Sequence, residues 1–159
     1  MGVSGCGKST LGARLASVLG WAFQEGDALH PPANVAKMAS GRPLDDGDRA
    51  PWLAATAAWI DRAVGSGQSG VVTCSALKRA YRTALIDGRP DVRLVFPNAA
   101  KSLIAARLAG RSGHFMPAAL LDSQFAALEP PGPDERAVEL DASTDVEAQV
   151  ARVRTALGV

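Results

Sequence analysis

Cysteine is scarce in this sequence, and long hydrophobic runs are missing. The 159 residues contain only Cys6 and Cys74, which excludes a disulfide framework. No apolar stretch approaches the roughly 18 residues of a membrane span, so we predict no membrane partner. The first residues, Met1 to Ser4, show neither the charged nor the apolar region of a signal peptide, which predicts a cytoplasmic location.

An excess of charge of one sign is also missing. Lys and Arg total 17 against 16 Asp and Glu, which leaves a net charge of +1. Such a chain has no overall basic field, and we therefore predict no nucleic-acid partner. The hydrophobic fraction of 47% and charged fraction of 21% are typical of globular proteins, and the length predicts a single domain over residues 1–159.

Short β-like runs alternate with helical stretches along the chain. This alternation predicts an α/β fold with a parallel sheet. The predicted strands cover 21–24, 71–74, 92–96 and 137–140, and the predicted helices cover 8–19, 31–38, 48–63, 78–86, 98–108, 118–128 and 146–157. Asp48 is predicted to cap the third helix and Asn98 the fifth, while Pro97 is predicted to end the strand before it.

The first residues match the phosphate-binding pattern G-x-x-x-x-G-K-[ST] without a mismatch. Glycines let the backbone curl so that N–H groups point at phosphate oxygens, and the helix that follows adds its N-terminal dipole. In this pattern Lys8 reaches the terminal phosphates and the Ser9 hydroxyl binds Mg²⁺. We therefore predict an ATP site formed by Gly2, Val3, Ser4, Gly5, Cys6, Gly7, Lys8, Ser9 and Thr10.

Asp27 and His30 follow the first predicted strand, where ligand-facing residues of an open α/β sheet gather. The Asp27 carboxylate could accept a proton from an attacking hydroxyl group, or it could cap the helix that begins near Pro31. His30 could donate a hydrogen bond to a polyol, or it could be an ordinary loop histidine. The predicted phosphoryl donor nearby favours the functional interpretation of Asp27.

Three basic residues are candidates for holding an acidic substrate. Arg49 lies near a helix start, which the helix dipole disfavours for a cation, so it could grip a carboxylate or pair with Asp46 or Asp48. Lys78 and Arg82 lie one helical turn apart and could face a substrate or form a solvated basic face.

Arg107 and Arg111 share one helical face and precede a Gly-containing polar break. A hinged segment with two arginines is typical of a lid that closes over phosphates, excludes water and neutralises charge on the transferred phosphoryl group. We predict such a lid over residues 107–117, with His114 and Phe115 helping it to dock. The alternative is a basic pair on the surface.

Several blocks of the sequence occur in the same order in gluconokinases. They are Gly2–Thr10, Gly26–Pro31, Lys37–Leu44, Asp46–Leu53, Cys74–Lys78 and Gly113–Phe115. The chain thus resembles this family of small P-loop kinases, which are similar to shikimate and adenylate kinases, over essentially its whole length.

The resemblance implies the phosphorylation of D-gluconate by ATP with Mg²⁺. It also implies a three-layer P-loop kinase fold with a five-stranded parallel sheet, a mobile lid and, in many members, a homodimer. Within this resemblance Lys8, Asp27, Arg107 and Arg111 are the catalytic candidates, and the substrate candidates are Asp27, His30, Arg49, Lys78 and His114. The alternatives are a kinase for a shikimate-like acid and a regulatory P-loop NTPase.

A phosphate loop normally joins a strand to a helix, yet only Met1 precedes Gly2. The resemblance implies a short apolar strand before the loop, inside the sheet. Without it, buried N–H and C=O groups of two interior strands lack partners at a cost of roughly 1–3 kcal/mol each. We therefore expect this chain to be poorly soluble or inactive, and a longer chain that supplies the strand to be folded and active.

Overall fold

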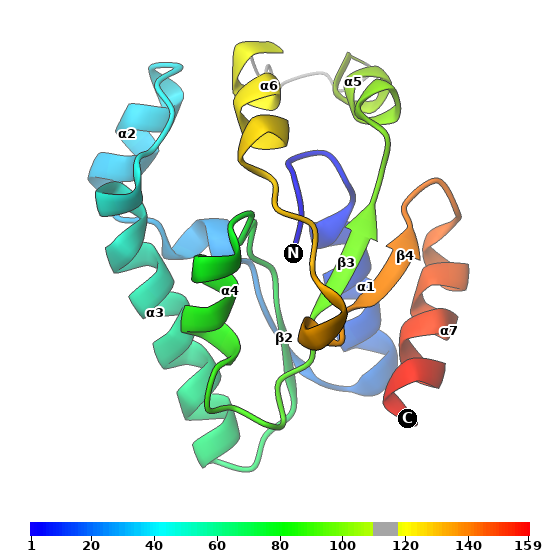
Figure 1. Cartoon of the computed structure of the whole chain (residues 1–159). Coiled ribbons are helices and arrows are strands. Elements are labelled where there is room, and N and C mark those ends of the chain that lie inside the picture. The colour runs from blue at the N-terminus through cyan, green and yellow to red at the C-terminus, as the bar shows by residue number, and fades with distance from the viewer. Residues whose placement is uncertain (110–117) are drawn as a thin grey trace.

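Four short strands form the centre of the molecule. The computed structural model describes residues 1–109 and 118–159. Strand β1 (Ala22–Gln24) pairs in parallel with β2 (Gly70–Val72), and β3 (Val95–Asn98) pairs in parallel with β4 (Val138–Asp141). The predicted α/β class with parallel strands and flanking helices is confirmed (Figure 1).

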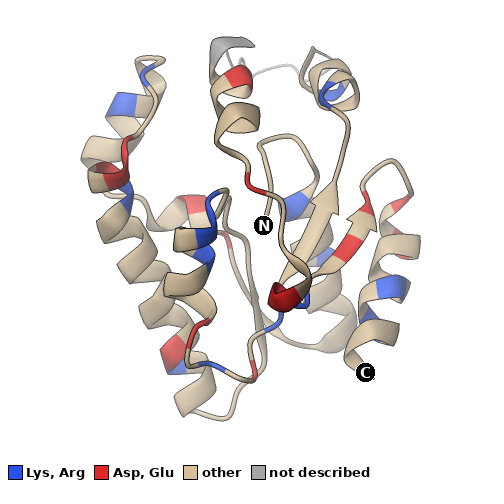
Figure 2. Ribbon diagram, viewed as in Figure 1, with Lys and Arg blue, Asp and Glu red and all other residues tan. Residues whose placement is uncertain are grey.

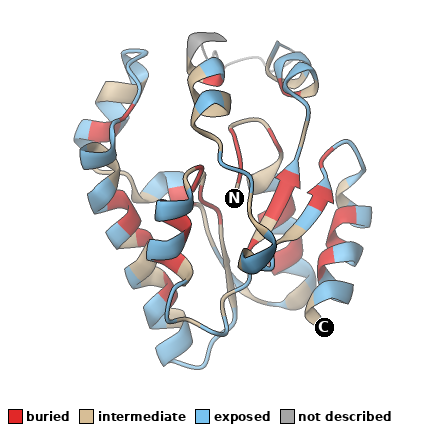
Figure 3. Cartoon of the chain, viewed as in Figure 1, coloured by how far each residue is buried: buried red, intermediate tan, exposed pale blue. Residues whose placement is uncertain are grey.

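Helices cover both faces of these strands. They are α1 (Lys8–Leu19), α2 (Pro32–Ala39), α3 (Asp46–Gly65), α4 (Arg79–Ile86), α5 (Lys101–Ala109), α6 (Ala118–Ala127) and α7 (Val146–Leu157), with short 3₁₀ turns η1 (Gly26–Leu29) and η2 (Pro133–Glu135). One core lies between α1, α7 and β4, and another lies between α3 and α4. Buried residues accordingly concentrate on the facing sides of these elements (Figure 3).

The expected single five-stranded sheet is not what the described residues form. They contain two separate two-stranded sheets, with Ala22 opposite Gly70 in one and Val95 opposite Val138 in the other. Backbone hydrogen bonds from Met1 to Val95 and from Gly2 to Ser75 connect the two sheets at one point. The rest of the space between β2 and β3 holds no strand in this part of the chain.

Helix α3 begins earlier than predicted. Asp45, not Asp48, is the N-cap, and the two residues form a reciprocal capping box. Asp45 Oδ1 accepts a hydrogen bond from Asp48 N at 2.9 Å, and Asp48 Oδ2 accepts one from Asp45 N at 2.8 Å. The prediction was wrong by three residues because Asp48 supplies the second half of the cap rather than the first.

The predictions for Pro97 and Asn98 were also wrong. Both residues lie inside β3, and α5 begins only at Lys101. The Asn98 side chain donates a hydrogen bond to Glu139 on neighbouring β4 at 2.8 Å instead of capping a helix. Pro97 has no N–H to donate, but the backbone groups of Phe96 and Asn98 make the hydrogen bonds to β4. The nitrogen of Pro97 faces the other edge of β3, so the strand tolerates the proline.

Candidate active site

The turn before α1 has the geometry of a phosphate loop. Gly2, Gly5 and Gly7 adopt positive φ values of 137°, 82° and 98°. A Cβ atom at Gly5 would approach Ile104 and Leu108 of α5 to 3.1 and 3.2 Å, whereas one at Gly7 would meet nothing within 4 Å. Glycine is thus needed for the backbone conformation at all three positions, and at Gly5 for space as well.

The hydrophobic side of the loop anchors it to the core. Val3 and Cys6 are buried against Leu77, Ile104 and Leu121. The Lys8 ammonium donates a hydrogen bond to Val3 O across the loop at 2.9 Å. Ser9 and Thr10 lie exposed on the first turn of α1, where the free N–H groups of the helix also lie. The arrangement fits a nucleoside triphosphate, with polar groups on one side and apolar anchors on the other.

Asp27 is held at the end of β1 by the glycine before it. Gly26 N donates a hydrogen bond to Thr73 Oγ1 at 3.0 Å, and the Trp52 indole N–H donates one to Gly26 O at 2.7 Å. A Cβ atom on Gly26 would lie 1.8 Å from Thr73 O, so no other residue fits there. Asp27 then projects from η1 as an exposed carboxylate.

Lys8 and Asp27 lie near the same buried residue, Cys74. Burial raises the pKa of the Cys74 thiol to about 11, while the charge of Lys8 lowers it and that of Asp27 raises it. The thiol is therefore neutral. Cys74 is buried as predicted, but it does not lie in the predicted strand over 71–74, because β2 ends at Val72. Backbone contacts bring the start of the phosphate loop and the residue before Asp27 to the segment that follows β2, because Gly2 N donates to Ser75 O and Gly26 N donates to Thr73 Oγ1.

His30 stacks on Trp52 rather than lying free in a loop. The two ring centroids are 4.4 Å apart and the planes differ by 11°. Burial lowers the pKa of His30, the charge of Asp27 raises it, and the charge of Arg49 lowers it further. The imidazole is thus neutral at pH 7 and lies within electrostatic reach of two other predicted site residues.

Arg49 and Lys78 converge on one tyrosine. The Arg49 guanidinium lies 5.9 Å from the centroid of the Tyr81 ring, and the Lys78 ammonium lies 5.5 Å from it. Lys78 donates hydrogen bonds to both carboxylate oxygens of Asp46 at 2.7 and 2.9 Å, and the Tyr81 hydroxyl donates to Asp46 as well. The hydrogen bond from Lys78 is the main reason that the pKa of Asp46 is lowered.

The alternative pairing of Arg49 with Asp46 or Asp48 is not observed. Asp46 pairs with Lys78 and Asp48 with Lys37, and across residues 1–109 and 118–159 neither aspartate forms an ion pair with Arg49. Arg49 instead donates a hydrogen bond to the Leu44 carbonyl. Basic residues gather at the start of α4 beside this site (Figure 2).

Arg82 neither faces a substrate nor forms a solvated face with Lys78. Its side chain is 1% exposed, and it forms an ion pair with Glu135. The guanidinium also donates hydrogen bonds to the carbonyls of Leu77 at 3.1 Å and Glu129 at 2.8 Å. Both predicted alternatives for Arg82 were therefore wrong, and the residue joins α4 to the segment before β4.

The predicted lid is only partly described. Arg107 lies in the last turn of α5, and its guanidinium donates a hydrogen bond to Ala142 O at 2.6 Å. Arg111, His114 and Phe115 lie outside the described residues, as does most of the predicted 107–117 segment. The lid therefore stays a prediction.

Three residues of the site were missed in the sequence. Asp46 and Tyr81 contact the Lys78 ammonium. Lys78 and Tyr81 are three residues apart at a helix start, and this spacing could have indicated that their side chains are neighbours. Gln124 of α6 accepts a hydrogen bond from Ser4 N in the phosphate loop at 2.7 Å. No sequence pattern links Ser4 with Gln124, because the contact joins residues 120 positions apart.

The described residues hold no group of three His, Cys, Asp or Glu side chains placed to bind a metal ion. The phosphate-loop pattern predicts that the Ser9 hydroxyl, together with nucleotide phosphates, would hold a Mg²⁺ ion at this site. The exposed position of Ser9 on the first turn of α1 fits that role. Among these same residues, no helix is long and apolar enough to cross a membrane.

Comparison with known proteins identifies related kinases. The family described as AAA domain matches residues 1–131. The chain is 54% identical to a gluconokinase of Gluconobacter oxydans over 88% of its length and 79% of the relative's, and 43% identical to the thermosensitive gluconokinase of Escherichia coli over 92% and 79%. A sugar kinase crystal structure from Janibacter superposes with a TM-score of 0.93 at 45% identity, covering 100% of this chain and 92% of that one. A gluconokinase structure from Sinorhizobium meliloti superposes with a TM-score of 0.87 at 43% identity, covering 99% of this chain and 89% of that one.

Proposed function

Because this chain belongs to the gluconokinase family of P-loop kinases, we propose that it transfers the γ-phosphoryl group of ATP to the 6-hydroxyl group of D-gluconate. One observation carries the proposal: residues 73–75, which follow β2, bond to both candidate regions. Ser75 O accepts a hydrogen bond from Gly2 N of the phosphate loop at 3.0 Å, and Thr73 Oγ1 accepts one from Gly26 N, next to Asp27, at 3.0 Å. These contacts support a phosphoryl donor and a proton acceptor that work side by side.

In this reaction a new bond forms between the sugar oxygen and the γ-phosphorus, while the bond to the bridging β–γ oxygen breaks and ADP leaves with that electron pair. Asp27 accepts the proton of the attacking hydroxyl group. Lys8 and the N–H groups of the loop stabilise the negative charge on the phosphate oxygens. The Ser9 hydroxyl would hold Mg²⁺, which would supply further neutralisation of that charge.

The carboxylate of gluconate is assigned to Arg49 and Lys78. These two cations flank the Tyr81 ring, and a planar guanidinium offers two parallel N–H groups to a carboxylate. In the structure the Asp46 carboxylate binds the Lys78 ammonium, which is the same chemistry that a substrate carboxylate needs. His30, neutral and stacked on Trp52, is placed to hydrogen-bond a substrate hydroxyl group.

The lid over 107–117 completes the proposal. Arg107 and Arg111 neutralise charge on the transferred phosphoryl group, and His114 helps the lid to dock on the substrate. Closure excludes water and so limits futile ATP hydrolysis. The family resemblance further supports a homodimer, which size-exclusion chromatography with light scattering tests directly.

The central experiment measures ADP release with a panel of sugar acids. We expect gluconate to stimulate ADP release strongly and shikimate and other polyol acids to do so weakly or not at all. Slow ADP release that is independent of every acid would indicate a regulatory NTPase and refute the kinase assignment. Removal of Mg²⁺ with EDTA should stop the reaction.

Two substitutions test the assigned residues. Lys8→Ala should abolish transfer, since the phosphate-loop pattern assigns this ammonium to the terminal phosphates. The circular dichroism spectrum should stay unchanged, because the hydrogen bond that Lys8 donates to Val3 O lies within the loop. Arg49→Lys retains the charge but loses the paired N–H groups, so it should mainly raise KM for gluconate. Arg62→Lys, at the exposed far end of the same helix, is the matched control and should change neither constant. An Arg49→Lys effect on ATP binding alone would contradict the assignment.

A further inference from the structure

Asn34 is a buried polar residue in a helix that is mostly exposed. Of the eight residues of α2, only Asn34 is buried, with 5% of its surface exposed. A buried amide is costly unless its polar atoms are hydrogen-bonded. Helix α2 is therefore anchored through a polar side chain, whose hydrogen bonds must replace those that it would form with water.

The side-chain amide of Asn34 has one orientation that satisfies its neighbours. Asn34 Nδ2 donates a hydrogen bond to the backbone oxygen of Asp48, in the first turn of α3, at 2.6 Å. A carbonyl oxygen only accepts hydrogen bonds, so the NH₂ group, and not the oxygen of the amide, must face it. The same Nδ2 atom lies 3.5 Å from Nδ1 of His30. The second N–H of the amide is thus available to His30.

This contact determines which nitrogen of His30 carries the proton. An NH₂ group donates and cannot accept, so Nδ1 is the unprotonated nitrogen of the neutral ring and Nε2 carries the hydrogen. Burial lowers the pKa of His30, which keeps the ring neutral at pH 7. Nε2 has no hydrogen-bond partner within residues 1–109 and 118–159, and no buried side-chain nitrogen or oxygen there lacks one, so Nε2 reaches the surface.

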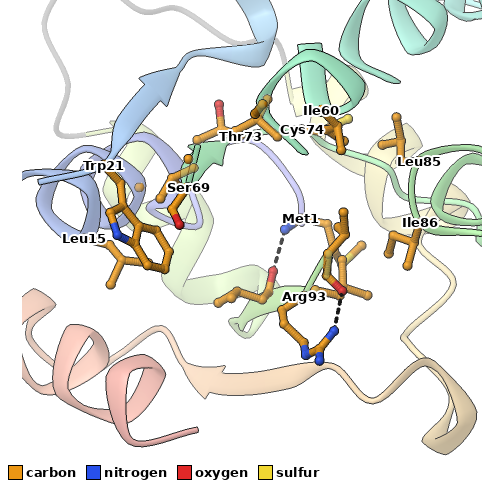
Figure 4. A pocket seen from close by; sticks show the side chains of 18 of the residues that line it. Met1, Leu15, Trp21, Ile60, Ser69, Thr73, Cys74, Leu85, Ile86 and Arg93 are labelled. Atoms are coloured by element: carbon orange, nitrogen blue, oxygen red, sulfur yellow. Dashed lines mark hydrogen bonds between the residues drawn. The ribbon is translucent and has the colours of Figure 1, made fainter. Parts of the chain in front are cut away.

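The plane of the His30 ring is fixed from the side opposite to solvent. Trp52 is 1% exposed, and its ring stacks on that of His30 at 4.4 Å. The Trp52 indole N–H is itself bonded to Gly26 O at 2.7 Å, and Gly26 N is bonded to Thr73 Oγ1, beside the cavity between the two sheets (Figure 4). Stacking thus sets the plane of the imidazole, and Asn34 sets which edge of the ring faces α2.

We infer that Asn34 is a positioning residue that holds His30 in the Nε2–H tautomer, so that His30 donates a hydrogen bond to a substrate oxygen and does not act as a base. Only the identity of the acceptor as a substrate oxygen rests on the proposed function. Asp27 and His30 then have opposite roles, since the carboxylate accepts and the imidazole donates. A hydroxyl group can both donate and accept, so a polyol suits this pair.

Charged groups surround His30 on three elements. After burial, the charge of Asp27 in η1 raises the pKa of His30, and that of Arg49 in α3 lowers it. Lys37 in α2 and Asp48 in α3 form an ion pair with each other, so their charges offset one another. Asn34→Asp would add a carboxylate, which only accepts, beside Nδ1. It should therefore move the proton to Nδ1 and raise the pKa of His30.

The test uses long-range proton–nitrogen NMR spectra of the ligand-free protein, which distinguish a protonated from an unprotonated ring nitrogen. His30 and His114 are the two histidines of the sequence, so His114→Gln identifies the signals of His30. Above the pKa of the ring, we expect the proton on Nε2 in the original chain and on Nδ1 in Asn34→Asp. Lys37→Met is the matched control, because it removes an ion pair between the same helix and Asp48 and should leave the proton on Nε2.

Steady-state kinetics supply the second readout. The loss of one hydrogen bond to the substrate should raise KM for gluconate about ten-fold in Asn34→Asp, with kcat and KM for ATP little changed, and Lys37→Met should raise it much less. Should Asn34→Asp not fold, Asn34→Ala replaces it, and the ring should then populate both tautomers.

Three results would overturn the inference. They are a proton on Nδ1 in the original chain, an unchanged tautomer in the Asn34 variant, and equal effects of the Asn34 variant and Lys37→Met on the tautomer and on KM. The last result would show that Asn34 acts only by holding α2 in place. Failure of the original chain to phosphorylate gluconate would instead refute the proposed function, while the tautomer measured without ligand would still decide the role of Asn34.

Discussion

Removal of the Arg82 guanidinium is expected to destabilise the protein strongly. Arg82 is 1% exposed and its partner Glu135 is 11% exposed. Arg82→Met would leave the Glu135 carboxylate buried without its cation and several carbonyls without a donor. Breaking a buried pair in this way costs about 3–5 kcal/mol. For a chain of this length that corresponds to a fall in Tm of roughly 6–20 °C.

A matched control lies three residues away. Arg79 pairs with Asp134, the neighbour of Glu135, but the two side chains are 54% and 62% exposed. Exposed pairs contribute about 0–1 kcal/mol, so Arg79→Met should lower Tm by only a few degrees. Thermal unfolding followed by circular dichroism, with urea unfolding to obtain the free energy, measures both variants.

The double variant Arg82→Met/Glu135→Leu sharpens the test. Replacement of both charges by apolar groups removes the unpaired carboxylate, so it should recover a substantial part of the stability lost in Arg82→Met. A loss below about 1 kcal/mol in Arg82→Met would refute the reasoning. So would a variant of unchanged stability whose KM for gluconate rises, because that result would place Arg82 at the substrate.

Three further outcomes can be measured. Gly26→Ala should cost about 3 kcal/mol in urea unfolding, since its Cβ would lie 1.8 Å from Thr73 O, whereas Gly65→Ala, with open space around it, should stabilise by up to about 1 kcal/mol. The folded-state pKa of His30 is lowered, so the neutral imidazole contributes to stability fully above pH 6.5, and this contribution is lost as the pH falls below that value. His30→Phe keeps a ring that stacks on Trp52 but has no group to protonate. Its Tm should therefore fall less between pH 7.5 and 5.5 than the Tm of the original chain. Asp27→Asn should lower kcat at least about 100-fold with little change in Tm, and a smaller loss of kcat would argue against proton transfer to Asp27.

The elements of the fold were predictable where local signals agree. The helix over 8–19 and the helix over 146–157 have the predicted bounds, since glycines end both and apolar residues recur at helical spacing. The start of α3 was not predictable from a single capping residue, because Asp45 and Asp48 act together. Pro97 misled for a different reason: a proline is tolerated in a strand whose N–H would face no partner.

The phosphate loop was predictable because its chemistry is contiguous in sequence. The other parts of the site depend on contacts between distant residues. Arg49 and Lys78 meet at Tyr81 only through the packing of α3 against α4, and Arg82, one turn beyond Lys78, turns inward to Glu135. Periodicity places residues on a common helix face, but it does not say what each face meets.

The division of the strands into two pairs has a consequence for how the protein unfolds. Where a continuous sheet breaks as a unit, two sheets that share few backbone hydrogen bonds can open separately. The connections across the gap include α1, which packs on β2 and α7, and the Met1–Gly2 contacts. They also include the contacts of Arg79 and Arg82 with the segment before β4. Cooperativity of unfolding thus depends on such connections, and weakening one of them would broaden the transition as well as shift its midpoint.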